Sequence, residues 1–196
     1  MVAIDTIATA LLSKAGGRSI RRSTLDCVAW CVGAYLAPAA PALLAAGLAV
    51  LGNGPVEAAS NKVRIANLVD VSFGTIANLG ADAVQSQSVC VYADTNTNGY
   101  NITGIGTGPG GSFQLSSGAA SMSFNVLWNS SAGQTSGTQL TPNVPLTGQV
   151  SAATQQTCSN GPASSASLVV VVRSAALSSA AAGSYNGSLT LLVGAE

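Results

Sequence analysis

The chain has 196 residues, of which only 7% are charged, and its seven basic and seven acidic residues give a formal net charge of zero. An ordinary soluble domain carries roughly 25% charged residues. So few basic residues cannot form the phosphate-binding surface of a nucleic-acid-binding protein. The sequence has no histidine, which excludes His-dependent acid–base or nucleophilic catalysis and His-ligated metal sites. We therefore expect neither a nucleic-acid partner nor an enzyme.

An uncharged stretch at residues 27–51 dominates the first part of the chain. Basic residues precede it, among them Arg21 and Arg22, and Val56-Glu57-Ala58 follows it shortly afterwards. A basic flank, an apolar core and small residues at a cleavage point are typical of an export signal. We predict that residues 1–58 are a leader and signal peptide, cleaved between Ala58 and Ala59, and that residues 59–196 form the exported domain.

The same uncharged stretch is long enough to span a bilayer. An uncleaved segment that anchors the domain in a membrane is therefore the alternative to cleavage, and in that case this segment alone would contact the membrane.

The exported part begins with an alternating apolar run. Val63, Ile65, Val69 and Val71 share one parity, and Asn67 is the single break. Alternation with a period of two predicts a strand. Two further strands are predicted at residues 89–93 and 100–105, joined by a hairpin turn at residues 98–99, where Asn-Gly is a strong turn signal.

Two segments near this hairpin match ligand-binding patterns only in part. The segment from Asp94 to Gly99 matches the first half of an EF-hand calcium loop, but its twelfth position is Ile105 in place of a glutamate, so calcium would bind weakly. Glycines at positions 106, 108 and 111 match the spacing of a dinucleotide-binding loop, but a strand fragment follows them and not a helix. We predict a turn and a glycine-rich loop, with no metal and no cofactor.

The second half of the exported part continues the strand pattern. Residues 122–128 and 185–193 alternate between apolar and polar, whereas residues 168–172 are a continuous apolar run, which predicts a strand buried on both faces. Residues 178–182 can form one helical turn. Short strands separated by Gly-, Ser- and Asn-rich loops predict an all-β fold, an antiparallel β-sandwich.

Two cysteines, Cys90 and Cys158, lie in the exported part. An even pair of cysteines in an exported protein predicts a disulfide. Closing a loop of this length restricts the unfolded chain by roughly 4 kcal/mol on the chain-entropy model. A domain with few large core side chains gains much from such a crosslink.

Three short motifs, in order along residues 61–196, carry a family resemblance. They are Val71-Ser-Phe-Gly-Thr-Ile76, Tyr100-Asn-Ile-Thr103, and Gly183-Ser-Tyr185 followed by an alternating strand to Val193. In this order, behind an export signal, they resemble the spore coat protein U family, the pilin subunits of archaic chaperone–usher pathways.

The resemblance implies an immunoglobulin-like sandwich that lacks its last strand. A periplasmic chaperone fills the gap first, and a strand from the next pilin subunit replaces it at the outer-membrane usher. The protein would then pass through the periplasm to a pilus on the cell surface. Leu189, Leu191 and Val193 would form the acceptor edge for the incoming strand, since their strand has no charge until Glu196 and no residues follow for another.

The chain departs from the family pattern at its first strand, because no cysteine precedes Phe73 in the exported part. Residues 59–71 are then either the first strand, as in a terminal or minor subunit, or the donor strand itself, as in a shaft subunit. Two other functions stay open: a tip adhesin that binds a ligand through its loops or Trp128, and a membrane-anchored envelope domain. The phase of Trp128 with the neighbouring apolar residues favours a place in the core.

Overall fold

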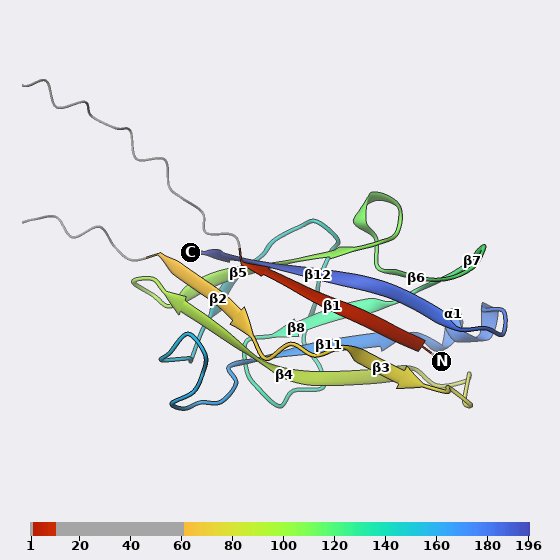
Figure 1. Cartoon of the computed structure of the whole chain (residues 1–196), viewed down its shortest axis with the longest axis horizontal. Helices are drawn as coiled ribbons and strands as arrows, with labels where there is room; N and C mark the ends of the chain where they lie inside the picture. Colours follow the sequence, from red (N-terminus) through yellow and green to blue (C-terminus); the bar gives the residue numbers. More distant parts are fainter. Residues whose placement is uncertain (1, 11–60) are drawn as a thin grey trace, which may run out of the picture. The chain divides into compact units, whose positions relative to one another are not determined.

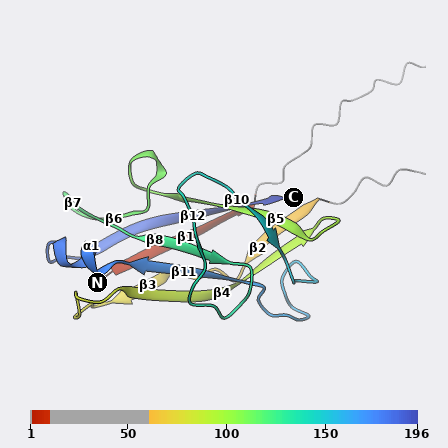
Figure 2. The ribbon, with the colours of Figure 1, turned by 180° about the vertical axis from the view of Figure 1, so that it is seen from behind.

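The computed structural model describes residues 2–10 and 61–196, and these residues are almost entirely β (Figure 1). Two sheets pack against each other with an apolar core between them, which confirms the predicted antiparallel β-sandwich (Figure 2). The strands of the first sheet are, in order, β10 (Leu146–Val150), β5 (Gly99–Gly106), β12 (Tyr185–Ala195), β1 (Val2–Ala10) and β3 (Val71–Gly74), with β6 (Gln114–Ser117) and β7 (Ala120–Ser123) attached beside β12. Those of the second are β2 (Lys62–Ala66), β4 (Ala83–Asp94), β11 (Ala166–Val172), β8 (Asn125–Asn129) and β9 (Thr138–Gln139).

Strand β11 is buried along its whole length, as its continuous apolar run predicted. It lies at the centre of its sheet, between β4 and β8. The loop after β8 covers its outer face: Ser167 Oγ accepts a hydrogen bond from the Gln134 N–H and donates one to the Ser131 carbonyl, at 2.9 and 2.8 Å. The loop therefore covers this face of β11 at Ser167, and the core covers the opposite face.

The run predicted as one strand at residues 63–73 is divided between the two sheets. Strand β2 pairs with β4 in one sheet, and β3 lies in the other. The chain turns at Asn67, whose φ is 63°, a conformation that Asn tolerates better than most residues. The side-chain amide of Gln87 then holds the crossing by accepting from the Val69 N–H and donating to the Val69 carbonyl. Alternation of apolar and polar residues alone does not indicate that the chain passes from one sheet to the other.

The alternating run at residues 122–128 is also divided, because β7 belongs to the first sheet and β8 to the second. Phe124 lies between them and its N–H donates to the Phe113 carbonyl at 3.1 Å. A turn does lie at residues 98–99, with Asn98 at a φ of 54°, but the predicted hairpin is wrong, because β4 and β5 belong to different sheets and do not pair with each other. The predicted helical turn begins earlier than expected, as helix α1 (Ser174–Ser179), and a short 3₁₀ turn, η1 (Pro109–Gly111), precedes β6.

The N-terminal segment Val2–Ala10 forms β1 and belongs to the same compact unit as residues 61–196. This segment was predicted only as part of the leader. The uncharged stretch at residues 27–51 and the predicted cleavage point, Ala58–Ala59, lie outside the described residues. Within residues 2–10 and 61–196, no helix has the length and apolar character needed to cross a membrane.

Candidate functional site

The first sheet contains a gap between two strands of the domain that is filled from far away in the sequence. Strands β12 and β3 are not neighbours, because β1 lies between them (Figure 1). It runs parallel to β12 over nine register pairs, from Val2↔Tyr185 to Ala10↔Val193. It also pairs with β3 in the antiparallel direction over residues 2–4, with a register shift after Val2. The gap between β12 and β3 is therefore a strand-binding groove, here called the acceptor groove.

The predicted acceptor-edge residues Leu189, Leu191 and Val193 all lie on β12. Their side chains are completely buried and belong to the core. One backbone edge of residues 189–193 pairs with β5, and the other edge pairs with β1. The three residues thus form the apolar floor beside the groove, and the hydrogen-bonding groups offered to an incoming strand come from the backbone of β12.

The four residues considered as a donor or first strand lie inside the domain itself. Val63 and Ile65 are buried in β2, and Val71 is buried in β3. Val69 lies in the crossing between these strands and is 64% exposed. Residues 61–74 thus contribute one strand to each sheet of their own domain. Val69 is therefore an exception to the expected alternation.

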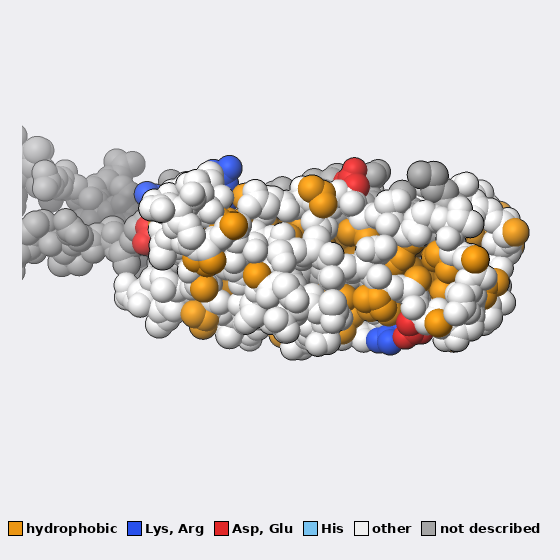
Figure 3. Space-filling model, turned by 90° about the horizontal axis from the view of Figure 1, so that it is seen from below, with side chains coloured by type: hydrophobic (Ala, Val, Ile, Leu, Met, Phe, Trp, Pro, Cys, Tyr) orange, Lys and Arg blue, Asp and Glu red, His pale blue; other side chains and the backbone are white. Residues whose placement is uncertain are grey.

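An apolar pocket of about 340 Å³ opens at the end of the acceptor groove. Gly74 and Tyr185 are among its lining residues, and both are register partners of Val2, the first residue of β1. Met122 and Leu177 also line it. Figure 3 shows hydrophobic side chains concentrated toward the end of the sandwich where β3 and α1 lie. The groove therefore continues past the start of β1 into an accessible apolar space.

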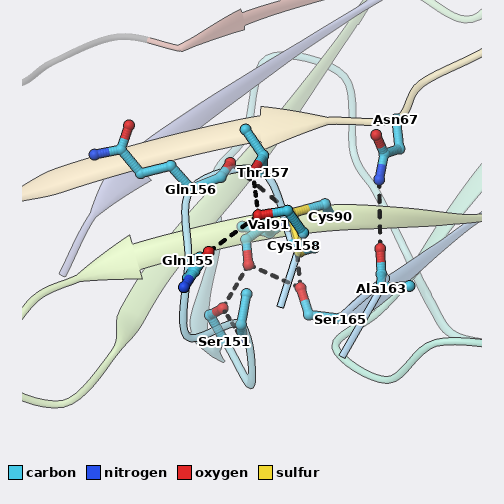
Figure 4. Close-up of a disulfide and its surroundings, with 12 residues drawn as sticks. Asn67, Cys90, Val91, Ser151, Gln155, Gln156, Thr157, Cys158, Ala163 and Ser165 are labelled. Carbon is cyan, nitrogen blue, oxygen red and sulfur yellow. Dashed lines mark hydrogen bonds between the residues drawn. A yellow bond between two sulfur atoms is a disulfide. The ribbon is translucent and has the colours of Figure 1, made fainter. Parts of the chain in front are cut away.

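The opposite end of the sandwich is crosslinked. Cys90 on β4 and Cys158 in the loop before β11 form the predicted disulfide, with their Cα atoms 5.9 Å apart (Figure 4). Beside it, the buried hydroxyls of Ser151 and Ser165 both donate to the Val91 carbonyl, and the Val91 N–H donates to Ser165 Oγ. These bonds attach the long loop between β10 and β11 to β4. Disulfides of this kind persist in oxidising compartments.

Trp128 lies in the core and is 1% exposed. Its Nε1–H donates to Tyr100 Oη at 3.1 Å, and the two rings meet edge to face at 81°. Burial of the Tyr100 hydroxyl raises its pKa to about 12, although the hydrogen bond from Trp128 acts in the opposite direction. Trp128 therefore joins β8 to β5 across the sandwich and is not available at the surface for a ligand.

The chemistry that the described residues offer is hydrogen bonding by a strand edge and contact with apolar side chains. Within residues 2–10 and 61–196, no three His, Cys, Asp or Glu side chains are grouped to hold a metal ion. The segment Asp94–Gly99, which partly matched a calcium loop, forms the turn between β4 and β5, in which the Gly99 N–H donates to Thr95 Oγ1. No family model matches the chain, and no curated protein matches it either.

Sequence reasoning missed the participation of residues 2–10 in the site. The segment VAIDTIATA contains five Val, Ile or Thr residues among nine, and no Gly or Pro, a composition that favours a strand. That signal was present in the sequence, but a position in front of the predicted export signal gave no reason to pair the segment with the domain.

Proposed function

We propose that this protein is a structural subunit of a surface pilus, in which each subunit is completed by a β-strand from a neighbour. The observation that carries the proposal is the acceptor groove, because β12 and β3 leave room for one strand and residues 61–196 do not supply it. The family resemblance of the Phe73-Gly74 and Tyr185–Val193 motifs supports the same function.

An open groove of this kind is unfavourable for an isolated domain. Between Leu189 and Val193, the edge of β12 that faces away from β5 pairs only with β1 among the described strands. Unpaired N–H and C=O groups beside a buried apolar floor are costly and attract other strands. Strand addition satisfies the backbone groups and covers the apolar side chains in one step.

This function requires partners that match the groove. A periplasmic chaperone would protect the edge during transit, an outer-membrane usher would organise assembly, and other pilin subunits would donate the permanent strand. The Cys90–Cys158 disulfide fits passage through an oxidising compartment. A subunit of this type needs shape and a free edge rather than reactive groups, which agrees with the low charge of the chain.

The test compares the exported chain that begins at Ala59 with the same chain carrying the nine-residue strand VAIDTIATA after a flexible linker at Glu196. We expect the first to self-associate or to purify with a chaperone. The second should be monomeric with a higher unfolding midpoint, because its own strand covers the groove. Light scattering after size exclusion and thermal unfolding measure both properties.

A matched control carries the same extension with proline in place of both isoleucines, which have opposite parity in the strand, so that at least one N–H directed toward β12 is removed. It should behave like the chain without an extension. If the chain from Ala59 is a stable monomer whose unfolding midpoint does not change with either extension, the pilin function is contradicted.

A further inference from the structure

We propose that Asn160 is a modification site: its side-chain amide is lost by deamidation in the folded protein, while the same reaction is blocked at two similar positions. Asn-Gly pairs lie at residues 98–99, 160–161 and 186–187. Glycine has no side chain that would keep its nitrogen away from the preceding asparagine, so the three pairs are alike in sequence. The differences between them come from the structure, and they do not depend on the proposed pilus function.

The reaction needs only the chain and water. The backbone nitrogen of Gly161 attacks Cγ of Asn160, the new C–N bond closes a succinimide ring, and the side-chain nitrogen leaves as ammonia with the proton of the Gly161 N–H. Water then opens the ring at one of its two carbonyl groups. The product is an aspartate, or an isoaspartate in which the backbone continues through the former side chain. One water is taken up and one ammonia is released, so no oxidant or reductant is needed.

The pair at residues 98–99 is held at every backbone group. The Gly99 N–H, whose nitrogen would have to attack, donates to Thr95 Oγ1 at 2.8 Å, and the Gly99 carbonyl accepts from the Glu196 N–H at 3.1 Å. The Asn98 N–H donates to the Thr95 carbonyl at 3.1 Å, and the Asn98 carbonyl accepts from the Ser151 N–H at 2.9 Å. The ring can therefore close only after this turn has opened.

The pair at residues 186–187 is held in extended form within β12. Asn186 is the register partner of Ser116 in β6, and the Ser116 hydroxyl donates to the Asn186 carbonyl at 3.4 Å. Strand β6 also approaches Gly187 closely, since a Cβ atom added there would lie 2.7 Å from the Gln114 carbonyl oxygen. The backbone of this pair cannot bend into a ring without losing its contacts with β6.

The pair at residues 160–161 is exposed, in the loop between β10 and β11. The Thr154 hydroxyl is shared between the carbonyl oxygens of Asn160 and Gly161, at 3.2 and 3.0 Å. Among residues 2–10 and 61–196, no group accepts a hydrogen bond from the Gly161 N–H, and none binds the Asn160 side chain. The attacking nitrogen and its target carbon can therefore meet without any opening of the sandwich.

The loop is anchored on both sides of this pair (Figure 4). Before it, Cys158 is bonded to Cys90. After it, the Ala163 carbonyl accepts a hydrogen bond from the Asn67 side chain at 3.3 Å. Neither contact involves residues 160–161, so we expect the protein to stay folded after the modification and the modified form to accumulate.

Deamidation adds charge to a part of the chain that has none. No charged residue lies between Asp94 and Arg173 in the sequence, and the formal net charge of the whole chain is zero. A carboxylate at position 160 makes the chain acidic and places a negative charge on the exposed loop beside the disulfide. The modified form should therefore separate from the original one by anion exchange.

The test follows all three pairs in one sample of the folded full chain, kept at mildly alkaline pH with its disulfide intact. Pepsin digestion at acid pH stops the reaction and gives usable peptides, whereas trypsin has no site between Arg64 and Arg173. Mass spectrometry after chromatography measures asparagine, aspartate and isoaspartate at each position over time. We expect Asn160 to convert about tenfold or more faster than Asn98 and Asn186, because these two require local opening first. In reduced, urea-unfolded protein the three rates should become similar.

A pair of variants tests the protection of Asn98. Thr95→Val removes the hydroxyl that accepts from the Gly99 N–H, so Asn98 should convert severalfold faster. The matched control, Thr97→Val, replaces a hydroxyl by a methyl group in the same turn and leaves that bond in place, so the rate at Asn98 should not change. The rate at Asn186 in the same samples reports any general loosening of the fold.

The outcomes decide the proposal. Equal rates at the three positions in the folded protein would overturn it, and so would a faster reaction at Asn98 than at Asn160. The acidic form should be absent from the variant Asn160→Gln, and its persistence there would place the modification elsewhere. Faster conversion of Asn98 in Thr95→Val but not in Thr97→Val would support protection by the bonded N–H. None of these results depends on the acceptor groove, so the proposed function is tested separately.

Discussion

The two ends of the sandwich are built in different ways. At one end the Cys90–Cys158 disulfide and the buried hydroxyls of Ser151 and Ser165 attach a long loop to β4 (Figure 4). At the other end, helix α1 and the end of β3 border an apolar pocket of about 340 Å³. The first end is closed by covalent and polar bonds, and the second is left accessible.

The main stabilising bonds thus lie at one end of the sandwich, and the accessible apolar pocket lies at the other. A crosslink at the pocket end would fix the strands that border the acceptor groove, whereas a crosslink at the far end leaves them unconstrained. The acceptor groove begins at the accessible end, where Gly74 and Tyr185 meet the start of β1. We expect substitutions at the crosslinked end to cost most in stability and substitutions at the pocket end to cost less.

The largest effect should come from removing the disulfide with Cys90→Ala and Cys158→Ala together. The bridge spans a sequence separation of 68 residues, so its loss should lower the free energy of unfolding by about 4 kcal/mol on the chain-entropy model. Urea unfolding of the double variant measures the change. Reduction of the unaltered protein should give a similar loss, and an unchanged urea midpoint in both experiments would contradict the role given to the crosslink.

A smaller effect is expected for Leu177→Ala in α1. Leu177 is 4% exposed and lies in the core cluster, but it also lines the pocket, so it has fewer neighbours to lose than a central residue. We expect a loss of about 2 kcal/mol, at the low end for a buried leucine. The matched control is Leu168→Ala, at a completely buried site in β11, with an expected loss of about 4 kcal/mol. Equal losses in urea unfolding would show that the two regions are packed equally well.

The smallest effect concerns Asp82, also at the pocket end. Its carboxylate accepts hydrogen bonds from the Ser174 N–H and from Arg173 Nη1, both at 2.8 Å, and these bonds, that from Ser174 first, hold the pKa of Asp82 below its usual value. The stabilisation is therefore present above the unfolded-state pKa of about 4 and is lost as the pH falls through the lower folded-state pKa.

The variant Asp82→Asn tests this pH dependence. At pH 7 it should melt at a slightly lower temperature than the unaltered protein, and the gap should narrow as the pH approaches about 2. Comparing the two proteins at each pH removes the contribution of the other carboxyl groups. A gap of the same size at both pH values would mean that the charge of Asp82 has no part in the stability of this end.

The sequence was sufficient to predict the strands whose pattern is local. The alternation at residues 185–193 and the apolar run of β11 have the structure expected, and a turn lies at Asn98-Gly99, although it joins the two sheets and not two paired strands. The disulfide was also predictable, because residues 59–196 contain only two cysteines and therefore allow only one pairing.

What could not be predicted depends on contacts between distant segments. The division of the first strand at Asn67 is set by Gln87, which lies twenty positions further along the chain and binds the backbone of Val69. The place of β1 depends on a groove formed by two other segments, β3 and β12. Neither arrangement leaves a periodic signal in the residues concerned, since a strand has the same alternation whichever sheet it joins.

The division of the first strand between the two sheets has a mechanical consequence. A pull on the chain at Lys62, directed along β2, acts parallel to that strand, so the five register pairs between β2 and β4 carry the tension together and do not open one after another. Beyond the crossing at Val69, β3 passes the remaining tension to the other sheet. A force that enters the domain at this strand is therefore spread over both layers of the sandwich.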